Sequence, residues 1–255
     1  MERLIFDTHA HYQDKAFDAD RDELLASLPE KGVKRVVNCG TTAESSKQCK
    51  TLSERYDYLY FAAGIHPEDC AGTTDEDLAG IRAFTQHEKC VAIGEIGLDN
   101  HYPEPSKEEQ LKVFEAQLQM AKELSLPVII HDREAHGDTM ELLKKYRPAG
   151  VMHCFSGSVE MSKEVLSLGL YIGLGGAVTF KNAKKAVQVA QSVPLDRLLL
   201  ETDCPYMAPT PYRGKRNDSA LIPLVAGFIG ELRGKTCEEI LKITAANADA
   251  LFFHN

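Results

Sequence analysis

Short apolar runs recur along the whole chain, and stretches with helical periodicity separate them. The runs are rich in β-branched residues and apolar on both faces, which is typical of parallel strands that helices cover on each side. The strands predicted in this way are Leu4–Asp7, Arg35–Asn38, Leu59–Gly64, Cys90–Glu95, Pro127–His131, Val151–Cys154, Tyr171–Leu174 and Arg197–Glu201.

The clearest helix start is Ser106-Lys107-Glu108-Glu109, which has the form of a capping box. Apolar residues then recur at spacings of three and four, so one face of this helix is expected to pack on the core. They are Leu111, Phe114, Leu118 and Ala121. Pro127 separates this helix from the next predicted strand.

Eight alternations of strand and helix within 255 residues match the size and pattern of a (β/α)8 TIM barrel. We therefore expect a single α/β domain over residues 1–255. A doubly wound open sheet is the alternative, but it usually has a glycine-rich phosphate-binding turn after its first strand. This chain has Asp7-Thr8-His9-Ala10-His11 there. The segment Cys204–Asn217, with three prolines and a glycine, is predicted to be a long loop after the last strand.

The charge balance is acidic, with a net charge of -9 and an isoelectric point of about 5.5. A broad basic face that coats long stretches of nucleic acid is therefore not expected, although a few cations clustered around one pocket are compatible with this balance. An acidic surface is also compatible with a monomer.

The seven cysteines include no C-x-x-C pair, and their number is odd. This usage argues against a disulfide framework and suits a reducing compartment. The first residues contain no apolar stretch typical of a signal peptide, and no segment approaches the ~20 apolar residues that span a bilayer. We expect a soluble cytoplasmic protein without a membrane partner.

Polar residues interrupt the carboxyl ends of most predicted strands. In a barrel these ends open onto one face, where barrel enzymes build their active sites. The residues are His9 and His11 after the first strand, His66 after the third, Glu95, His131 and His153 at the next three, and Glu201 and Asp203 at the last.

His9 and His11 lie two residues apart, so their side chains point to the same side of a strand and are positioned to hold one ion. Imidazole and carboxylate ligands admit Zn²⁺, Mn²⁺, Fe²⁺ or Ni²⁺, and Mg²⁺ supports turnover in a looser site. One tetrahedral ion would not use all the candidate ligands, so two ions that share a bridging carboxylate are expected. The candidates are His9, His11, Glu95, His131, His153 and Asp203.

Each of these residues alone has a simpler interpretation. A single histidine at a strand end, such as His66, is more often hydrogen-bonded than catalytic, and Asp203 alone could cap a helix. Cys154 and Cys204 adjoin inward-facing residues and are expected to be small buried side chains turned away from the site. The complete set of polar strand ends favours a metal site.

Seven motifs in order along the chain resemble those of the TatD family of metal-dependent hydrolases. They are DTHAH, GIHP, GEIGLD, LPVIIHDREA, HCFSGS, IGLGGAVTF and LLLETDCPYMAPTPYRGKRN. The resemblance covers essentially the whole chain. It implies a distorted (β/α)8 barrel related to the amidohydrolases, a two-metal site and metal-dependent deoxyribonuclease activity.

The resemblance also implies a role for each matching residue. It assigns His9, His11 and Asp203 to a first ion, His131 and His153 to a second, and Glu95 to both. His66 and Glu201 would face the substrate. Arg213, in the run YRGKRN with Lys215 and Arg216, would lie in a loop that faces phosphate.

Together these assignments predict a phosphodiesterase in which Asp203 acts as general base on an activated water and His66 donates to the phosphate or the leaving group. The few cations suggest a footprint of a few nucleotides, at chain ends or on short single strands of DNA.

Two other functions fit the same residues. The site could hydrolyse an acyl or amide bond, such as an aminoacyl ester. Related enzymes of that kind often bridge their metals with a modified lysine, whereas this chain has Glu95 there and no lysine at the end of any predicted strand. A scaffold that has lost its chemistry would lack a ligand, and none is missing.

Overall fold

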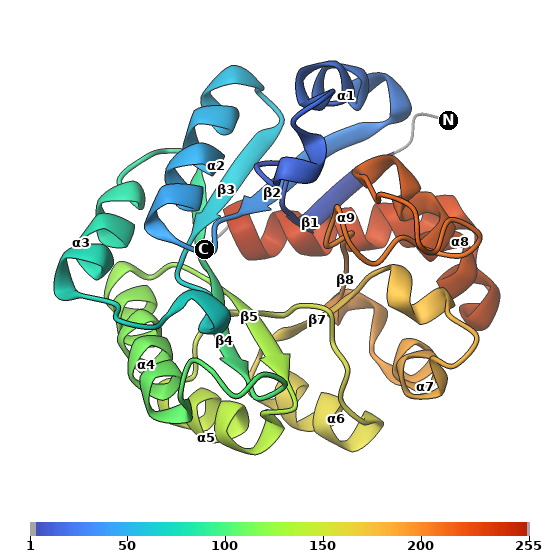
Figure 1. The fold of residues 1–255 in the computed structure, drawn as a ribbon. Helices are drawn as coiled ribbons and strands as arrows, with labels where there is room; N and C mark the ends of the chain where they lie inside the picture. Colours follow the sequence, from blue (N-terminus) through green and yellow to red (C-terminus); the bar gives the residue numbers. More distant parts are fainter. Residues whose placement is uncertain (1–3, 254–255) are drawn as a thin grey trace.

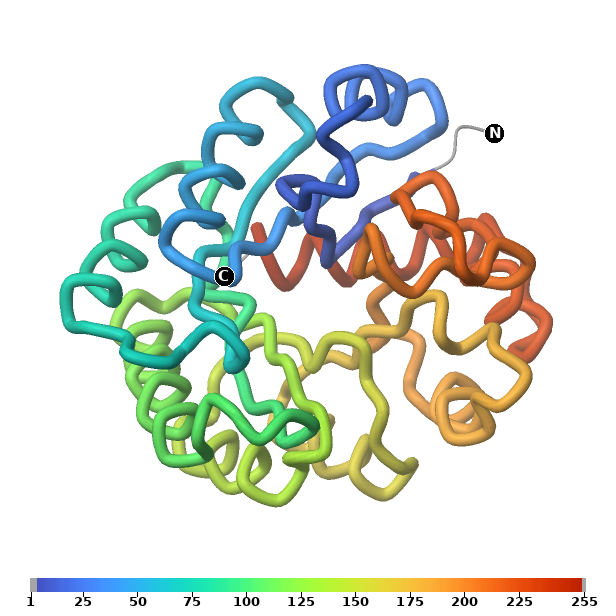
Figure 2. Tube along the Cα trace, viewed as in Figure 1, coloured from blue at the N-terminus to red at the C-terminus, as the bar shows by residue number. Residues whose placement is uncertain are grey.

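The computed structural model describes residues 4–253, and its eight strands form one parallel sheet in sequential order (Figures 1 and 2). Helices surround the sheet, so the predicted TIM barrel is confirmed. The strands are β1 Ile5–Ala10, β2 Val33–Cys39, β3 Leu59–Ala63, β4 Cys90–Asp99, β5 Val128–Arg133, β6 Gly150–Met152, β7 Tyr171–Leu174 and β8 Leu198–Leu200. The ends of the expected domain, residues 1–3 and 254–255, lie outside the described part.

Nine α-helices lie within residues 4–253: α1 Arg21–Ser27, α2 Ala43–Arg55, α3 Asp75–Phe84, α4 Lys107–Leu124, α5 His136–Tyr146, α6 Val159–Ser167, α7 Lys184–Ser192, α8 Ile222–Arg233 and α9 Cys237–Phe253. The predicted capping box begins α4: the Ser106 side chain accepts from the Glu109 N–H, and the Glu109 side chain accepts from the Ser106 N–H. The expected loop at Cys204–Asn217 lies between β8 and α8.

The barrel closes where β1 meets β8. The Thr8 hydroxyl donates to the Leu200 carbonyl at 3.0 Å, and Ala10 forms an isolated parallel bridge with Cys204. The Asp203 N–H donates to the His9 carbonyl at 2.9 Å. These contacts place the residues after β8 directly beside the end of β1.

The interior of the barrel is filled by apolar side chains from the strands. Phe6, Val37, Ile129, Val151 and Leu199 belong to one buried cluster. Helix α9 contributes Ala248, Leu251 and Phe252 to the same cluster. The rings of Phe6 and Phe252 lie 6.1 Å apart, and Phe6 is near the start of β1, so α9 covers the amino-terminal end of the barrel (Figure 1). The carboxyl ends of the strands are left open.

Four strands extend beyond their predicted ends: β1 to Ala10, β2 to Cys39, β4 to Asp99 and β5 to Arg133. β4 continues to Asp99, because Ile96–Asp99 pair with Ile130–Arg133 of β5. The pairing of these strands shifts register between Ile93 and Ile96, and in this irregular stretch the Glu95 N–H donates to the Gly40 carbonyl at 2.8 Å. Glu95 therefore lies within a strand, among backbone groups that fix its position.

Candidate metal centre

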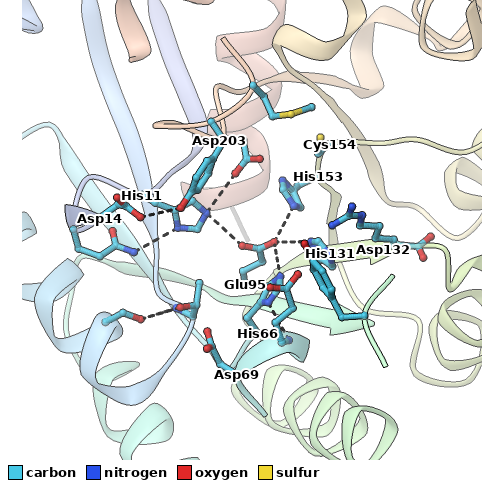
Figure 3. Close-up of a pocket in the computed structure, with 18 of the residues that line it drawn as sticks. His11, Asp14, His66, Asp69, Glu95, His131, Asp132, His153, Cys154 and Asp203 are labelled. Carbon is cyan, nitrogen blue, oxygen red and sulfur yellow. Dashed lines mark hydrogen bonds and ion pairs between the residues drawn. The ribbon is translucent and has the colours of Figure 1, made fainter. Parts of the chain in front are cut away.

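A cavity of about 870 Å³ opens at the carboxyl ends of the strands (Figure 3). The structure brings all six expected metal ligands together at this end of the barrel. Five of them line the cavity: His11, Glu95, His131, His153 and Asp203. The sixth, His9, is fully buried directly behind them.

Glu95 lies at the centre of this group, and its two oxygens face in different directions. Oε2 is 3.3 Å from His9 Nε2 and 3.4 Å from His11 Nε2. Oε1 is 2.9 Å from His153 Nε2 and 3.0 Å from His131 Nδ1. The carboxylate thus joins two sets of histidines (Figure 3).

The first set is His9, His11 and Asp203. The Nε2 atoms of the two histidines lie 2.9 Å apart, and Asp203 Oδ1 is 3.5 Å from His11 Nε2. His11 Nδ1 lies 2.9 Å from the Cys39 carbonyl, which can only accept, so Nδ1 carries the proton. In the neutral ring, His11 Nε2 therefore has the lone pair, and it is directed at the other members of the set.

The second set is His131 and His153. His131 Nε2 bonds to Asp99 Oδ2 at 2.8 Å, so its Nδ1 faces Glu95. Asp99 is 2% exposed. The sequence analysis missed Asp99, although residues 95, 97 and 99 alternate onto one face of an extended strand and Asp99 ends the GEIGLD run. From this position we expect the Asp99 carboxylate to orient the His131 ring and to make His131 a stronger metal ligand.

These donors fit a divalent metal ion. Within each of three groups, one ligand atom per residue lies within 4.8 Å of the others: His9, Glu95 and His153; His9, His11 and Asp203; His66, Glu95 and His131. Imidazole nitrogens with carboxylate oxygens are the set that zinc, manganese, iron or nickel takes in proteins. His153 Nδ1 is buried without a hydrogen bond, 3.5 Å from Glu201.

The charges of the site favour a bound cation. Burial raises the pKa of the Glu95 carboxyl, but the surrounding imidazoles, led by His153, outweigh it and hold this pKa well below its usual range. Burial lowers the pKa of His11, but the carboxylates of Asp203 and Glu95 raise it to about 10. The site thus pairs carboxylates with protons on imidazoles, and a metal ion would replace those protons.

His66 lines the cavity as expected. Its Nδ1 accepts the Glu68 N–H at 3.2 Å, and its Nε2 is 3.5 Å from Glu95 Oε1. Because Nδ1 is an acceptor, the neutral ring carries its proton on Nε2. His66 is therefore arranged to donate into the cavity, although it also lies close enough to Glu95 and His131 to join a metal group.

Glu201 does not face the cavity, contrary to the expectation from the sequence. It is 1% exposed and lies behind His153, where its Oε1 accepts the Cys154 N–H at 2.5 Å. A Cβ at Gly173 would come within 2.5 Å of Glu201 Oε2, so the glycine makes room for this carboxylate. Its position allows Glu201 to orient His153, not to contact substrate.

The three expected phosphate-facing cations are also placed outside the cavity wall. Both terminal nitrogens of Arg216 bond to Asp20 at 2.6 Å. The Arg213 guanidinium lies over the Phe180 ring, 4.3 Å from its centroid, and Lys215 is exposed. The one lysine or arginine that lines the cavity within residues 4–253 is Arg133, which the sequence analysis did not select.

The rim of the cavity is acidic and carries two tyrosines. Tyr102 and Tyr206 line it together with the carboxylates of Asp14, Glu68 and Asp69. Asp132 also lines the cavity, but its side chain is 3% exposed and bonds to His136 at 2.6 Å. Cys154 also lines the cavity rather than turning away, and burial raises its pKa to about 12, so it is a neutral thiol. Cys204 is buried as expected.

The chain is similar to known proteins over nearly its whole length. The family profile described as TatD related DNase matches residues 6–253. An uncharacterized metal-dependent hydrolase of Bacillus subtilis, YabD, is 44% identical over 98% of this chain and 99% of its own. A protein of Cronobacter sakazakii named 3'-5' ssDNA/RNA exonuclease TatD is 35% identical over 98% of both chains.

The same fold occurs in a solved structure. The crystal structure of YjjV, a TatD homolog from Escherichia coli, superimposes with a TM-score of 0.92 at 34% identity and covers 99% of each chain. Within residues 4–253, no helix combines the length and the apolar character needed to cross a membrane.

Proposed function

The chain belongs to the TatD family of metal-dependent hydrolases, and on that premise we propose that it is a nuclease that hydrolyses phosphodiester bonds near the ends of single-stranded DNA. The observation that carries the proposal is the position of Glu95, whose two oxygens face two separate sets of ligands. The exonuclease name of the Cronobacter sakazakii relative supports this substrate class and extends it to RNA.

Two divalent ions fit the arrangement. The first would be held by His9, His11 and Asp203, and the second by His131 and His153, with Glu95 contributing one oxygen to each. When bound, the ions would lower the pKa of a water molecule and draw negative charge from the phosphoryl oxygens.

Asp203 is placed to accept the proton of the attacking water. Its side chain is 20% exposed and faces the cavity, whereas that of Glu95 is 4% exposed. Burial raises the pKa of Asp203, but the hydrogen bond with His11 and the charges of the nearby imidazoles lower it, so the carboxylate is ionised. As the water oxygen bonds to phosphorus, its proton passes to Asp203.

His66 is placed to interact with the leaving group. The bond between phosphorus and the leaving oxygen breaks as the new bond forms, and the leaving oxygen needs a proton. His66 Nε2 carries a hydrogen when Nδ1 accepts from the Glu68 N–H, so it donates a hydrogen bond to this oxygen, and the proton that Asp203 took from the water passes to it. The remaining residues keep the histidines in place: the Cys39 carbonyl on His11 and Asp99 on His131.

The cysteines and the lining of the cavity bear on the cell compartment and on the partner. The cysteines form no disulfide within residues 4–253, which supports the proposed cytoplasmic location. Nucleic acid of a few nucleotides is the proposed partner, because the cavity is small and offers one arginine.

The test is cleavage of an end-labelled single-stranded oligonucleotide by the metal-loaded protein, beside a chelated sample and a neutral carboxylic ester. We expect metal-dependent shortening of the strand and no ester hydrolysis. A protein that binds metal, leaves the strand intact and cleaves the ester would overturn the proposal and favour the acyl or amide alternative.

A further inference from the structure

We propose that Tyr102 and Tyr206 are stacking platforms for two nucleobases, one on each side of the metal centre. This inference rests on the proposed nuclease function and specifies how that site holds a single strand. The bases that flank the reacting phosphate would lie flat on the two rings, while the phosphate lies over Glu95.

The exposure of these rings at the cavity is the first observation. Five large apolar side chains are exposed within residues 4–253, and two of them, Tyr102 and Tyr206, line the cavity. Their exposed fractions are 50% and 55%. Exposed aromatic rings that gather at a concave site indicate a ligand with apolar faces.

The positions of the rings are the second observation. Tyr206 lies in the loop after β8, where its N–H donates to the Asp203 carbonyl at 2.9 Å. Tyr102 lies in the loop after β4, three residues beyond Asp99. The strands follow one another around the barrel, so β4 lies across it from β8 (Figure 1). The two rings therefore border the metal centre on opposite sides.

Both rings are held in place without a ligand. The Tyr206 hydroxyl bonds to Asp14 Oδ2 at 2.9 Å. The Arg133 guanidinium lies 5.6 Å from the Tyr102 ring centroid, and the His101 ring meets its edge at 4.8 Å. A ring already fixed in position loses little conformational freedom when a base stacks on it.

The charge of the rim is the third observation. The carboxylates of Asp14, Glu68 and Asp69 line it with a single arginine, so phosphates away from the metals would gain little from this surface. Bases are neutral and present a flat π-face, which a tyrosine can hold whatever the sequence. Bases of a duplex are already stacked on one another, so the two rings would select single strands.

The experiment uses full-length, metal-loaded protein and a short single strand, with 2-aminopurine beside the reacting bond and phosphorothioate linkages that resist cleavage. Quenching of the 2-aminopurine fluorescence reports stacking and gives the Kd without turnover. Cleavage of the unmodified strand is measured in parallel. The variants are Tyr102→Ala and Tyr206→Ala, with Tyr102→Phe as the conservative variant.

We expect each alanine variant to weaken binding about 5- to 100-fold and to lose quenching at one position of the label. Tyr102→Phe should retain both. Tyr212→Ala is the matched control, because Tyr212 is 47% exposed on the same loop as Tyr206 but does not line the cavity. It should behave as the unaltered protein.

An abasic nucleotide separates stacking from general damage. If a ring holds a base, removing that base should abolish the effect of the matching alanine variant, because both changes remove the same contact. If the alanine substitution and the removal of the base weaken binding independently, and the protein still cleaves the strand, the stacking inference is overturned and the nuclease proposal stands. Tight binding with base-dependent quenching but no cleavage would overturn the nuclease proposal instead.

Discussion

The floor and the rim of the cavity are built from different parts of the chain. The floor consists of side chains at strand ends, and Glu95 and His153 there are 3% and 5% exposed. The rim tyrosines lie in loops and are about half exposed. On the floor, the Cys39 carbonyl holds His11 and Asp99 holds His131, whereas the rim carries carboxylates and rings that are open to solvent.

This difference separates the reaction from the choice of substrate. Buried ligands on paired strands keep their positions, and barrel enzymes place their chemistry at such strand ends. Loops change without disturbing the barrel, so they select what enters the cavity. The same metal ligands surrounded by different loops would act on a different substrate, so the proposed substrate is inferred from the residues of the rim.

Asp203→Asn tests the floor and should have the largest effect. Asparagine keeps the size and one oxygen of the side chain but cannot take the proton from water. We expect kcat to fall about 1,000-fold or more, with a smaller change in KM. Steady-state kinetics on a short single strand measure it, and a loss confined to KM would contradict the role of Asp203 as base.

Asp99→Asn tests the support beneath the floor. Without the carboxylate, His131 loses the partner that fixes its Nε2 proton, and metal affinity should fall about 10- to 100-fold. Metal titration measures this, and excess metal should restore cleavage. Asp69→Asn is the control, because Asp69 lines the cavity but no hydrogen bond or ion pair joins its side chain to a metal ligand among the described residues. Equal effects of both variants would attribute the loss to charge alone.

Two arginine substitutions test the rim, and we expect their effect on binding to be the smallest of the three. Arg133 lines the cavity, and Arg213 lies over Phe180 outside it. In a plot of the logarithm of the association constant for the single strand against the logarithm of salt concentration, Arg133→Ala should make the negative slope less steep by about 0.7. This is the change expected when one phosphate contact is lost. Arg213→Ala should leave the slope unchanged. The reverse order would favour the cation loop expected from the sequence.

The sequence predicted the barrel well because its strands are buried on both faces and therefore appear as short apolar runs. It also located His9 and His11, since their spacing places them on one face. It missed Asp99 because β4 was ended at Glu95, whereas pairing with β5 carries the strand to Asp99.

The errors about substrate-facing residues have one physical cause, which is contact between residues distant in the sequence. Arg216 is engaged by Asp20, 196 positions away. Glu201 is held behind His153 by the Cys154 N–H, 47 positions away. Such contacts depend on the closed barrel, and local patterns of polar and apolar residues do not report them.

The decisive test of the shared carboxylate is the metal content of Glu95→Ala, with Glu141→Ala as the control because Glu141 is an exposed residue of α5. Divalent metal per chain is measured by elemental analysis, and cleavage of an end-labelled single strand is measured on the same samples. We expect about two ions per chain and metal-dependent cleavage for the unaltered protein and the control. For Glu95→Ala we expect loss of metal and of cleavage, with the fold intact. A Glu95→Ala protein that keeps two ions and full turnover would show that Glu95 does not hold the metals.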